Sequence, residues 1–326
     1  MSGPHPATAA VRLAVRGVLA ECDPGDVVLA AVSGGADSLA LAAALAFEAP
    51  RLGVRGGAVV VDHALQPGSA EVARQAAAAC EALGLAPVSW VRVEVPRGRE
   101  GVEAAARAAR YDALAKAAAR EGARLVLLGH TLDDQAEQVL LGLTRGAGAR
   151  SLAGMPRARG LLRRPLLGVT REQTRASCGA EGLRWWEDPM NADPAYTRVR
   201  ARRALVDLER DLGPGVAAAL ARSADQLRED ADLLDGLADE AVARLGPGPW
   251  DVAALAALAR PVRTRVWRRL LLAAGAPAGQ LGSRHTDACD ALVTDWHGQG
   301  PLSAPGPLQV TRSGGRVSIA APAPVE

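Results

Sequence analysis

The feature that most constrains the fold is an alternation of short apolar runs with alanine-rich segments of helical spacing in the first half of the chain. Four runs rich in Val and Leu occupy residues 27–33, 57–63, 88–95 and 124–130. Helical patterns lie between them, at residues 38–48, 69–83 and 102–121. The runs are continuous rather than alternating, which is typical of strands buried on both faces. Repeated strand–helix–strand units predict an α/β fold with a doubly wound parallel sheet.

The pattern changes after Gly146, where residues 154–168 are rich in Arg, Pro and Gly. A glycine–proline–glycine sequence at residues 213–215 is a strong break. We therefore predict a catalytic domain over residues 1–212, whose segment 145–203 is rich in arginine. A smaller, mainly helical domain is expected over residues 213–326. Its predicted elements are a long helix at 216–245, one or two helices within 250–274, and a hairpin of strands 308–311 and 316–319.

The sharpest local signal is the sequence Ser33-Gly34-Gly35-Ala36-Asp37-Ser38, which follows a predicted buried strand and opens a helix. Two glycines allow a tight turn that exposes backbone amides, and the helix N-terminus adds unpaired N–H groups. The loop therefore predicts a phosphate site. Asp37 would repel phosphates unless a cation such as Mg²⁺ bridged the carboxylate and the phosphate oxygens. The alternative is an ordinary strand-to-helix turn.

This loop resembles the SGGxDS pyrophosphate loop of the N-type ATP pyrophosphatases, or PP-loop superfamily. The resemblance implies that ATP is bound through the six loop residues and that a carbonyl oxygen is activated by adenylation with release of diphosphate. In that superfamily the end of the second strand borders the adenosine, which here would be Asp62 and His63.

Further segments restrict the resemblance to one family within this superfamily. They are Val61-Asp62-His63, the helical set Glu103, Arg107, Arg110 and Tyr111, the segment from Gly129 to Leu141 with its His130, Asp133, Asp134 and Glu137, Thr144-Arg145-Gly146, Arg164-Pro165-Leu166-Leu167, Glu187-Asp188-Pro189-Met190-Asn191, and Tyr196 with Arg198, Arg200 and Arg202. In this order they resemble the tRNA(Ile)-lysidine synthetase family over residues 27–203, with a looser likeness over 250–319. Thr131 and Val199 differ from the His and Asn that the family usually has there.

The resemblance implies a two-step ligation. ATP adenylates C2 of the wobble cytidine in the CAU anticodon of an isoleucine tRNA, and the amine of free L-lysine then displaces AMP. The implied catalytic residues are Asp37, Arg110, His130 and Asp134, with Asp133 and Glu137 supporting lysine. Asp133 and Glu137 share one face of a helix. The same residue types have simpler roles: His130 could be a loop residue, and Asp133 or Asp134 could cap a helix.

Charge supports a polyanionic partner. Residues 145–203 contain 13 arginines and five acidic residues, a net charge of +8, whereas the whole chain carries +2. Such polarisation predicts a tRNA-binding face that includes Arg145, Arg198, Arg200 and Arg202. The alternative is a solvated surface rich in arginine. Trp185 and Trp186 are predicted to be packing residues rather than base-stacking platforms.

Composition and cysteine spacing weigh against other classes. No apolar run has the length of a membrane span, and no signal peptide is recognisable. Four scattered cysteines suggest reduced thiols, so a cytoplasmic enzyme is expected. The family resemblance also implies a homodimer. A tRNA thiolase of the same superfamily is the alternative, but thiolases typically carry C-x-x-C pairs, which this sequence lacks. An amidotransferase would need a domain with a nucleophilic cysteine. A non-catalytic binding module would be expected to have a degenerate loop.

Overall fold

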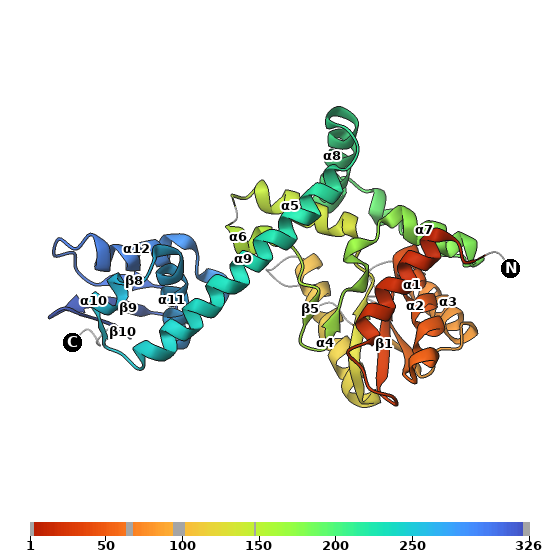
Figure 1. Cartoon of the computed structure of the whole chain (residues 1–326), viewed down its shortest axis with the longest axis horizontal. Helices are drawn as coiled ribbons and strands as arrows, with labels where there is room; N and C mark the ends of the chain where they lie inside the picture. Colours follow the sequence, from red (N-terminus) through yellow and green to blue (C-terminus); the bar gives the residue numbers. More distant parts are fainter. Residues whose placement is uncertain (1–2, 63–67, 94–101, 147, 322–326) are drawn as a thin grey trace. The chain divides into compact units, whose positions relative to one another are not determined.

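The computed structural model describes residues 3–62, 68–93, 102–146 and 148–321 (Figure 1). The chain divides into two compact units, Met1–Asp225 and Gln226–Glu326. The division lies within a single long helix, α9 (Val216–Leu245), which the sequence predicts at these bounds. The functional boundary after residue 212 stays a prediction.

The first unit contains a six-stranded sheet of order β3-β2-β1-β4-β6-β5. Its strands are β1 (Val27–Val32), β2 (Arg55–Asp62), β3 (Val88–Arg92), β4 (Ala123–Leu128), β5 (Ala158–Arg159) and β6 (Leu162–Arg163). All neighbouring pairs are parallel except β5 and β6, which form an antiparallel pair at the edge. The predicted doubly wound parallel sheet is confirmed.

The helices of the first unit are α1 (Pro6–Leu19), α2 (Ala36–Glu48), α3 (Ser69–Ala82), α4 (Val102–Glu121), α5 (Leu132–Leu143), α6 (Ala149–Leu152), α7 (Arg171–Ala180) and α8 (Thr197–Leu212). Of these, α2 and α3 pack against one face of the sheet and α4 packs against the other. Figure 1 shows α1, α2 and α3 grouped beside β1. Alternate residues of β1 point to opposite cores: Val28 and Ala30 pack in the core that includes α1, α2 and α3, whereas Leu29 packs with Leu114 of α4.

Burial on both faces holds for the central strands but not for β3. Residues of β1 and β4 are almost all buried, because helices lie on either side. None of the five residues of β3 is fully buried, and Trp90 is 44% exposed. The prediction of two-sided burial was therefore wrong for this strand. It lies at the edge of the sheet beside β2 and contains the polar residues Ser89 and Arg92.

The second unit combines helices with a small antiparallel sheet of order β7-β10-β9-β8. Its strands are β7 (Trp250–Asp251), β8 (Leu302–Ala304), β9 (Leu308–Ser313) and β10 (Arg316–Ala320), and its helices α10 (Val252–Ala256), α11 (Arg260–Ala273) and α12 (Ser283–Thr294). The predicted C-terminal hairpin is confirmed as β9 and β10. Trp267, Leu271 and Leu292 are fully buried in its core.

Candidate active site

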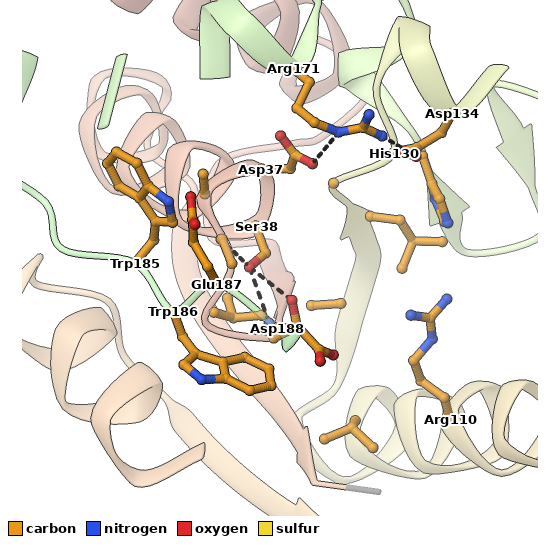
Figure 2. Close-up of a pocket in the computed structure, with 18 of the residues that line it drawn as sticks. Asp37, Ser38, Arg110, His130, Asp134, Arg171, Trp185, Trp186, Glu187 and Asp188 are labelled. Atoms are coloured by element: carbon orange, nitrogen blue, oxygen red, sulfur yellow. Dashed lines mark hydrogen bonds and ion pairs between the residues drawn. The ribbon is translucent and has the colours of Figure 1, made fainter. Parts of the chain in front are cut away.

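A cavity of about 700 Å³ opens at the carboxyl ends of β1 and β4 (Figure 2). The chain proceeds from β1 outward to β2 and β3 and then returns to the other side of β1 as β4. Ligand sites of open α/β sheets lie where the strand order reverses in this way. The cavity therefore occupies the position at which this fold binds ligands.

The loop after β1 forms one wall of the cavity and is held by its own serine. Ser38 Oγ accepts a hydrogen bond from the Ser33 backbone N–H at 3.1 Å and donates to the Gly35 carbonyl at 2.9 Å. Gly34 has a φ of +85°, which side chains rarely adopt. Because the first amides of an α-helix have no intrahelical acceptor, the start of α2 presents free donors toward an anion.

The loop after β4 approaches α2 too closely for a side chain. A Cβ atom at Gly129 would lie 3.2 Å from backbone atoms of Asp37 and Ser38. Glycine at this position therefore lets the two loops meet, and His130 follows directly on the cavity wall.

Asp37 lies on the cavity wall and is held from α7. Its carboxylate accepts a hydrogen bond from the Thr174 hydroxyl and lies 3.8 Å from Arg171 Nε. Burial raises the pKa of Asp37, although Thr174 and Arg171 oppose this rise. Figure 2 shows Asp37 and Asp134 on either side of the Arg171 guanidinium.

Asp134 both caps a helix and lines the cavity. Thr131 is the N-cap of α5, and Asp134 Oδ2 accepts the Thr131 N–H at 2.9 Å, completing a capping box. Its other oxygen lies 2.8 Å from Arg171 Nη2. Burial would raise the pKa of Asp134, but Arg171 and the Thr131 N–H lower it. Asp133 accepts the Arg171 backbone N–H at 2.7 Å and does not line the cavity.

Glu137 lies behind the cavity wall rather than on it. Its side chain is 2% exposed and contacts Arg171 at 3.3 Å and Arg202 of α8 at 2.8 Å. One turn of α5 therefore supplies a buried carboxylate that joins α7 and α8.

His130 is a neutral imidazole in a cationic setting. Burial lowers its pKa to about 3, with Arg110 and Arg164 acting in the same direction and Asp134 opposing them. Its Nδ1 atom is buried and has no hydrogen-bond partner among the residues that the structure describes. Such a nitrogen can serve as a hydrogen-bonding group for a ligand.

Arg110 reaches the cavity from α4. Burial lowers the pKa of its guanidinium, and its Nε atom is buried without a hydrogen-bond partner within the described part of the chain. Arg107 and Arg164 both contact the Tyr111 hydroxyl, at 3.5 and 3.3 Å. A half-buried cation next to an open cavity suits an anionic ligand. The side chain of Glu103, the expected partner of these arginines, lies outside the described residues.

The structure brings most of the predicted site together. Cavity-lining residues among those predicted are Ser33, Gly35, Ala36, Asp37, Ser38, Arg110, His130, Asp134, Arg198 and Arg202. Those that do not line it are Gly34, Asp62, Asp133, Glu137, Arg145 and Arg200. Asp62 is buried at the end of β2 with Arg92 at 3.9 Å. His63 lies outside the described residues.

Sequence reasoning missed Arg171 and Thr174. Both lie on the first turn of α7, whose N-cap Thr170 forms a capping box with Gln173. This Thr-x-x-Gln signature could have revealed a helix start near the site, but not where its side chains point.

The two tryptophans have different environments. Trp185 packs partly against the hydrophobic core, as predicted for a packing residue, and also lines the cavity. Trp186 lines the cavity too, and its backbone N–H donates to the Gly34 carbonyl at 2.9 Å. The segment before Glu187 is thus tied directly to the loop after β1.

Four of the 13 arginines of segment 145–203 form ion pairs with described carboxylates outside the segment. Arg163 pairs with Glu21 at 2.7 Å, Arg157 with Asp225 at 2.9 Å, and Arg171 and Arg202 with carboxylates of α5. Their acidic partners lie outside the segment, so the count of +8 overstates the charge that the surface presents.

Known proteins resemble the chain throughout its length. The family model of the PP-loop domain matches residues 11–209, and the model of the TilS substrate binding domain matches residues 251–318. The tRNA(Ile)-lysidine synthase of Thermobifida fusca is 53% identical over 98% of this chain and 100% of its own length. The chain belongs to the tRNA(Ile)-lysidine synthase family. The synthase of Leifsonia xyli is 56% identical over 91% of this chain and 90% of its own.

Membership of the tRNA(Ile)-lysidine synthase family makes the chain an ATP-using enzyme of the PP-loop class, as the motifs predict. A solved structure, the U34-tRNA thiolase NcsA from Methanococcus maripaludis with its [4Fe-4S] cluster, is 19% identical. It covers 68% of this chain and 78% of its own with a TM-score of 0.57, which confirms the fold. Among the described residues no helix combines the length and apolar character that crossing a bilayer requires.

Proposed function

We propose that this chain ligates L-lysine to C2 of the wobble cytidine in the CAU anticodon of tRNA(Ile), with ATP converted to AMP and diphosphate. The observation that carries the proposal is the shared cavity, because it is lined by Ser33 and residues 35–38 of the loop, by the carboxylate of Asp134 and by the cation Arg110. An ATP-dependent joining of an amine to a nucleobase needs these three kinds of group in one place.

The loop is suited to the diphosphate leaving group. Backbone amides of residues 35–37 at the start of α2 and the hydroxyl of Ser33 offer donors to phosphate oxygens, while Ser38 holds the loop through its bond to the Gly35 carbonyl. With the β- and γ-phosphates gripped there, the α-phosphorus is left open to the cytidine O2. Arg110 would stabilise the charge that develops on the transferred phosphate.

The residues present fit a magnesium ion that arrives with ATP. Within the described parts of the chain no group of three or more His, Cys, Asp or Glu side chains could hold a metal alone. Mg²⁺ in nucleotide sites needs only one or two carboxylates, because phosphates and water complete its shell. Asp37 of the loop would supply that carboxylate, and the ion would offset the charge of the departing diphosphate.

Lysine requires an anionic subsite, because its amine has a pKa of about 10.4 and is protonated in solution. Asp134 is the carboxylate of α5 that faces the cavity, with Asp133 and Glu137 supporting it through Arg171. Before the amine attacks C2 it must lose a proton. Asp134 would accept it, while His130, whose pKa burial lowers, would offer its Nδ1 atom, which has no partner among the described groups, as a hydrogen-bonding group.

The tRNA substrate is supported by the family and by the cationic side chains at the cavity. Arg198 and Arg202 line it, whereas Arg145 and Arg200 are exposed on α5's C-terminal flank and on α8. We propose that the exposed pair contacts the tRNA backbone. A homodimer and a cytoplasmic location, where tRNA is available, are further parts of the proposal.

The alternative, a tRNA thiolase, has less support. A sulfur-relay cysteine must be an accessible thiolate. Cys80 and Cys178 are buried, and burial raises the pKa of each to about 12. Neither thiol is suited to carry sulfur.

The test is incubation with ATP, labelled lysine and an isoleucine tRNA with a CAU anticodon, using an established synthase in parallel. We expect label on the tRNA and release of AMP and diphosphate in equal amounts. Unlabelled tRNA, or ADP and phosphate as products, contradicts the proposal. A methionine tRNA with the same anticodon serves as the control for specificity.

A further inference from the structure

The first turn of α7 holds the aspartate of the loop. Thr174 is fully buried, and its hydroxyl contacts both Asp37 Oδ1 and, at 2.8 Å, the Arg171 carbonyl. Arg171 approaches the other oxygen of Asp37, with Nε at 3.8 Å. Both oxygens of Asp37 therefore face partners on a helix more than 100 residues away in sequence.

The same guanidinium serves a second helix. Arg171 Nη2 lies 2.8 Å from Asp134 and 3.3 Å from Glu137, and its side chain is only 18% exposed. Asp37 and Asp134 come from α2 and α5, and the carboxylate of Asp134 acts to raise the pKa of Asp37. A planar cation between them reduces that repulsion and fixes their separation.

We propose that Arg171 and Thr174 are positioning residues that orient Asp37, and through it the Mg²⁺ that accompanies ATP. The inference rests on the proposed function, since it assigns Asp37 to that ion. Thr174 fixes the rotation of the carboxylate by a hydrogen bond. Arg171 lies between Asp37 and Asp134 and fixes the separation of the two carboxylates, which serve the diphosphate and lysine ends of the cavity.

The experiment compares Thr174→Val, Thr174→Ser, Arg171→Gln and Arg171→Lys with the unaltered protein. The first readout is binding of the non-hydrolysable analogue adenosine 5′-(α,β-methylene)triphosphate as a function of Mg²⁺ concentration. The second is kcat and KM for tRNA-dependent diphosphate release. The third is the thermal unfolding midpoint.

A matched control is available at the other end of α7. Arg12 is also 18% exposed and pairs with Glu181, the C-cap of α7, at 2.5 Å. Arg12→Gln therefore removes a comparable ion pair from the same helix without touching the cavity. Arg12 also lies over the Phe47 ring of α2, 3.4 Å from its centre, so this variant measures the general effect of weakening the packing of α1 against α7 and α2.

We expect Thr174→Val and Arg171→Gln to raise the Mg²⁺ concentration for half-saturation by about tenfold, the size expected when a hydrogen bond to a charged group is removed. Diphosphate release should fall chiefly in kcat. Thr174→Ser and Arg171→Lys should have a Mg²⁺ concentration for half-saturation close to that of the unaltered protein. Arg12→Gln should leave this concentration unchanged while lowering the unfolding midpoint.

The inference is overturned if folded Thr174→Val needs the same Mg²⁺ concentration for half-saturation as the unaltered protein. It is also overturned if Arg12→Gln raises this concentration as much as Thr174→Val does. If Arg171→Gln does not fold, Thr174→Val decides, because it exchanges one hydroxyl for a methyl group. Analogue binding does not require lysine transfer. A protein that binds the analogue as expected but releases no diphosphate with tRNA would refute the proposed function and leave this inference standing.

Discussion

Arg202 of α8 donates from Nε to Glu137 of α5 across 2.8 Å, and the carboxylate that accepts this bond is 2% exposed. The sequence motifs assign Arg202 to tRNA and Glu137 to lysine, yet the two side chains bind each other. Their pairing makes the packing of α5 against α8 depend on residues expected to act on substrates.

Arg202→Gln should therefore destabilise the first unit by about 1–3 kcal/mol, because it leaves a buried carboxylate with a weaker set of partners. Urea unfolding followed by circular dichroism measures this. Arg200→Gln is the control on the same helix. Arg200 bonds to Thr197 and to the carbonyls of Pro194 and Ala195 at the surface, so this variant should change stability by less than about 0.5 kcal/mol. Equal destabilisation of both variants would contradict the structural role of Arg202.

Asp37→Asn should raise the unfolding midpoint at neutral pH while abolishing diphosphate release. Burial raises the pKa of Asp37 in the folded protein above its value in the unfolded chain. The protonated carboxyl therefore stabilises the folded state fully at a pH below the pKa of the unfolded chain. This stabilisation is lost as the pH rises through the pKa of the folded protein. Each kcal/mol corresponds to roughly 2–4 °C in a unit of this size. Calorimetry from pH 4 to 8 should show the increase in midpoint shrinking toward low pH. An increase that is constant with pH would show that charge is not its cause.

His130 should stay neutral throughout the working pH range, because burial lowers its pKa to about 3. Below the unfolded pKa of about 6.5 the unfolded chain takes up a proton that the folded protein does not, so stability should fall as pH drops from there. Imidazole nitrogen resonances, with His130→Gln to assign the signal, provide the measurement. A His130 signal that titrates between pH 5 and 8 would refute the prediction.

Arg145→Gln should weaken tRNA binding and flatten its salt dependence, because Arg145 is exposed at the end of α5. Removing one arginine–phosphate ion pair reduces the slope of log K against log salt concentration by about 0.7–0.9. Arg163→Gln is the control, since Arg163 is 16% exposed and paired with Glu21. If both variants flatten the slope equally, charge number rather than exposure determines binding.

Local sequence predicted the sheet, the loop and several element bounds. The helix at 216–245 and the hairpin near residue 314 follow from hydrophobic spacing and turn residues, which act over a few positions. For strand β3 the same kind of pattern predicted burial on both faces, and this was wrong. Burial of a strand on both faces depends on whether the strand is central or at an edge of the sheet, which local sequence does not specify. The short hairpin of β5 and β6 and the contacts of α7 were not predicted.

The amino-acid sequence by itself determined the phosphate loop and its place at a strand end, because glycine conformation and helix initiation are properties of adjacent residues. Only the tertiary structure decided which charges meet. Asp37 and Thr174 are 137 positions apart, and Arg202 and Glu137 are 65 apart. Ion pairs and hydrogen bonds form between side chains within about 4 Å, a separation that folding sets and sequence distance does not.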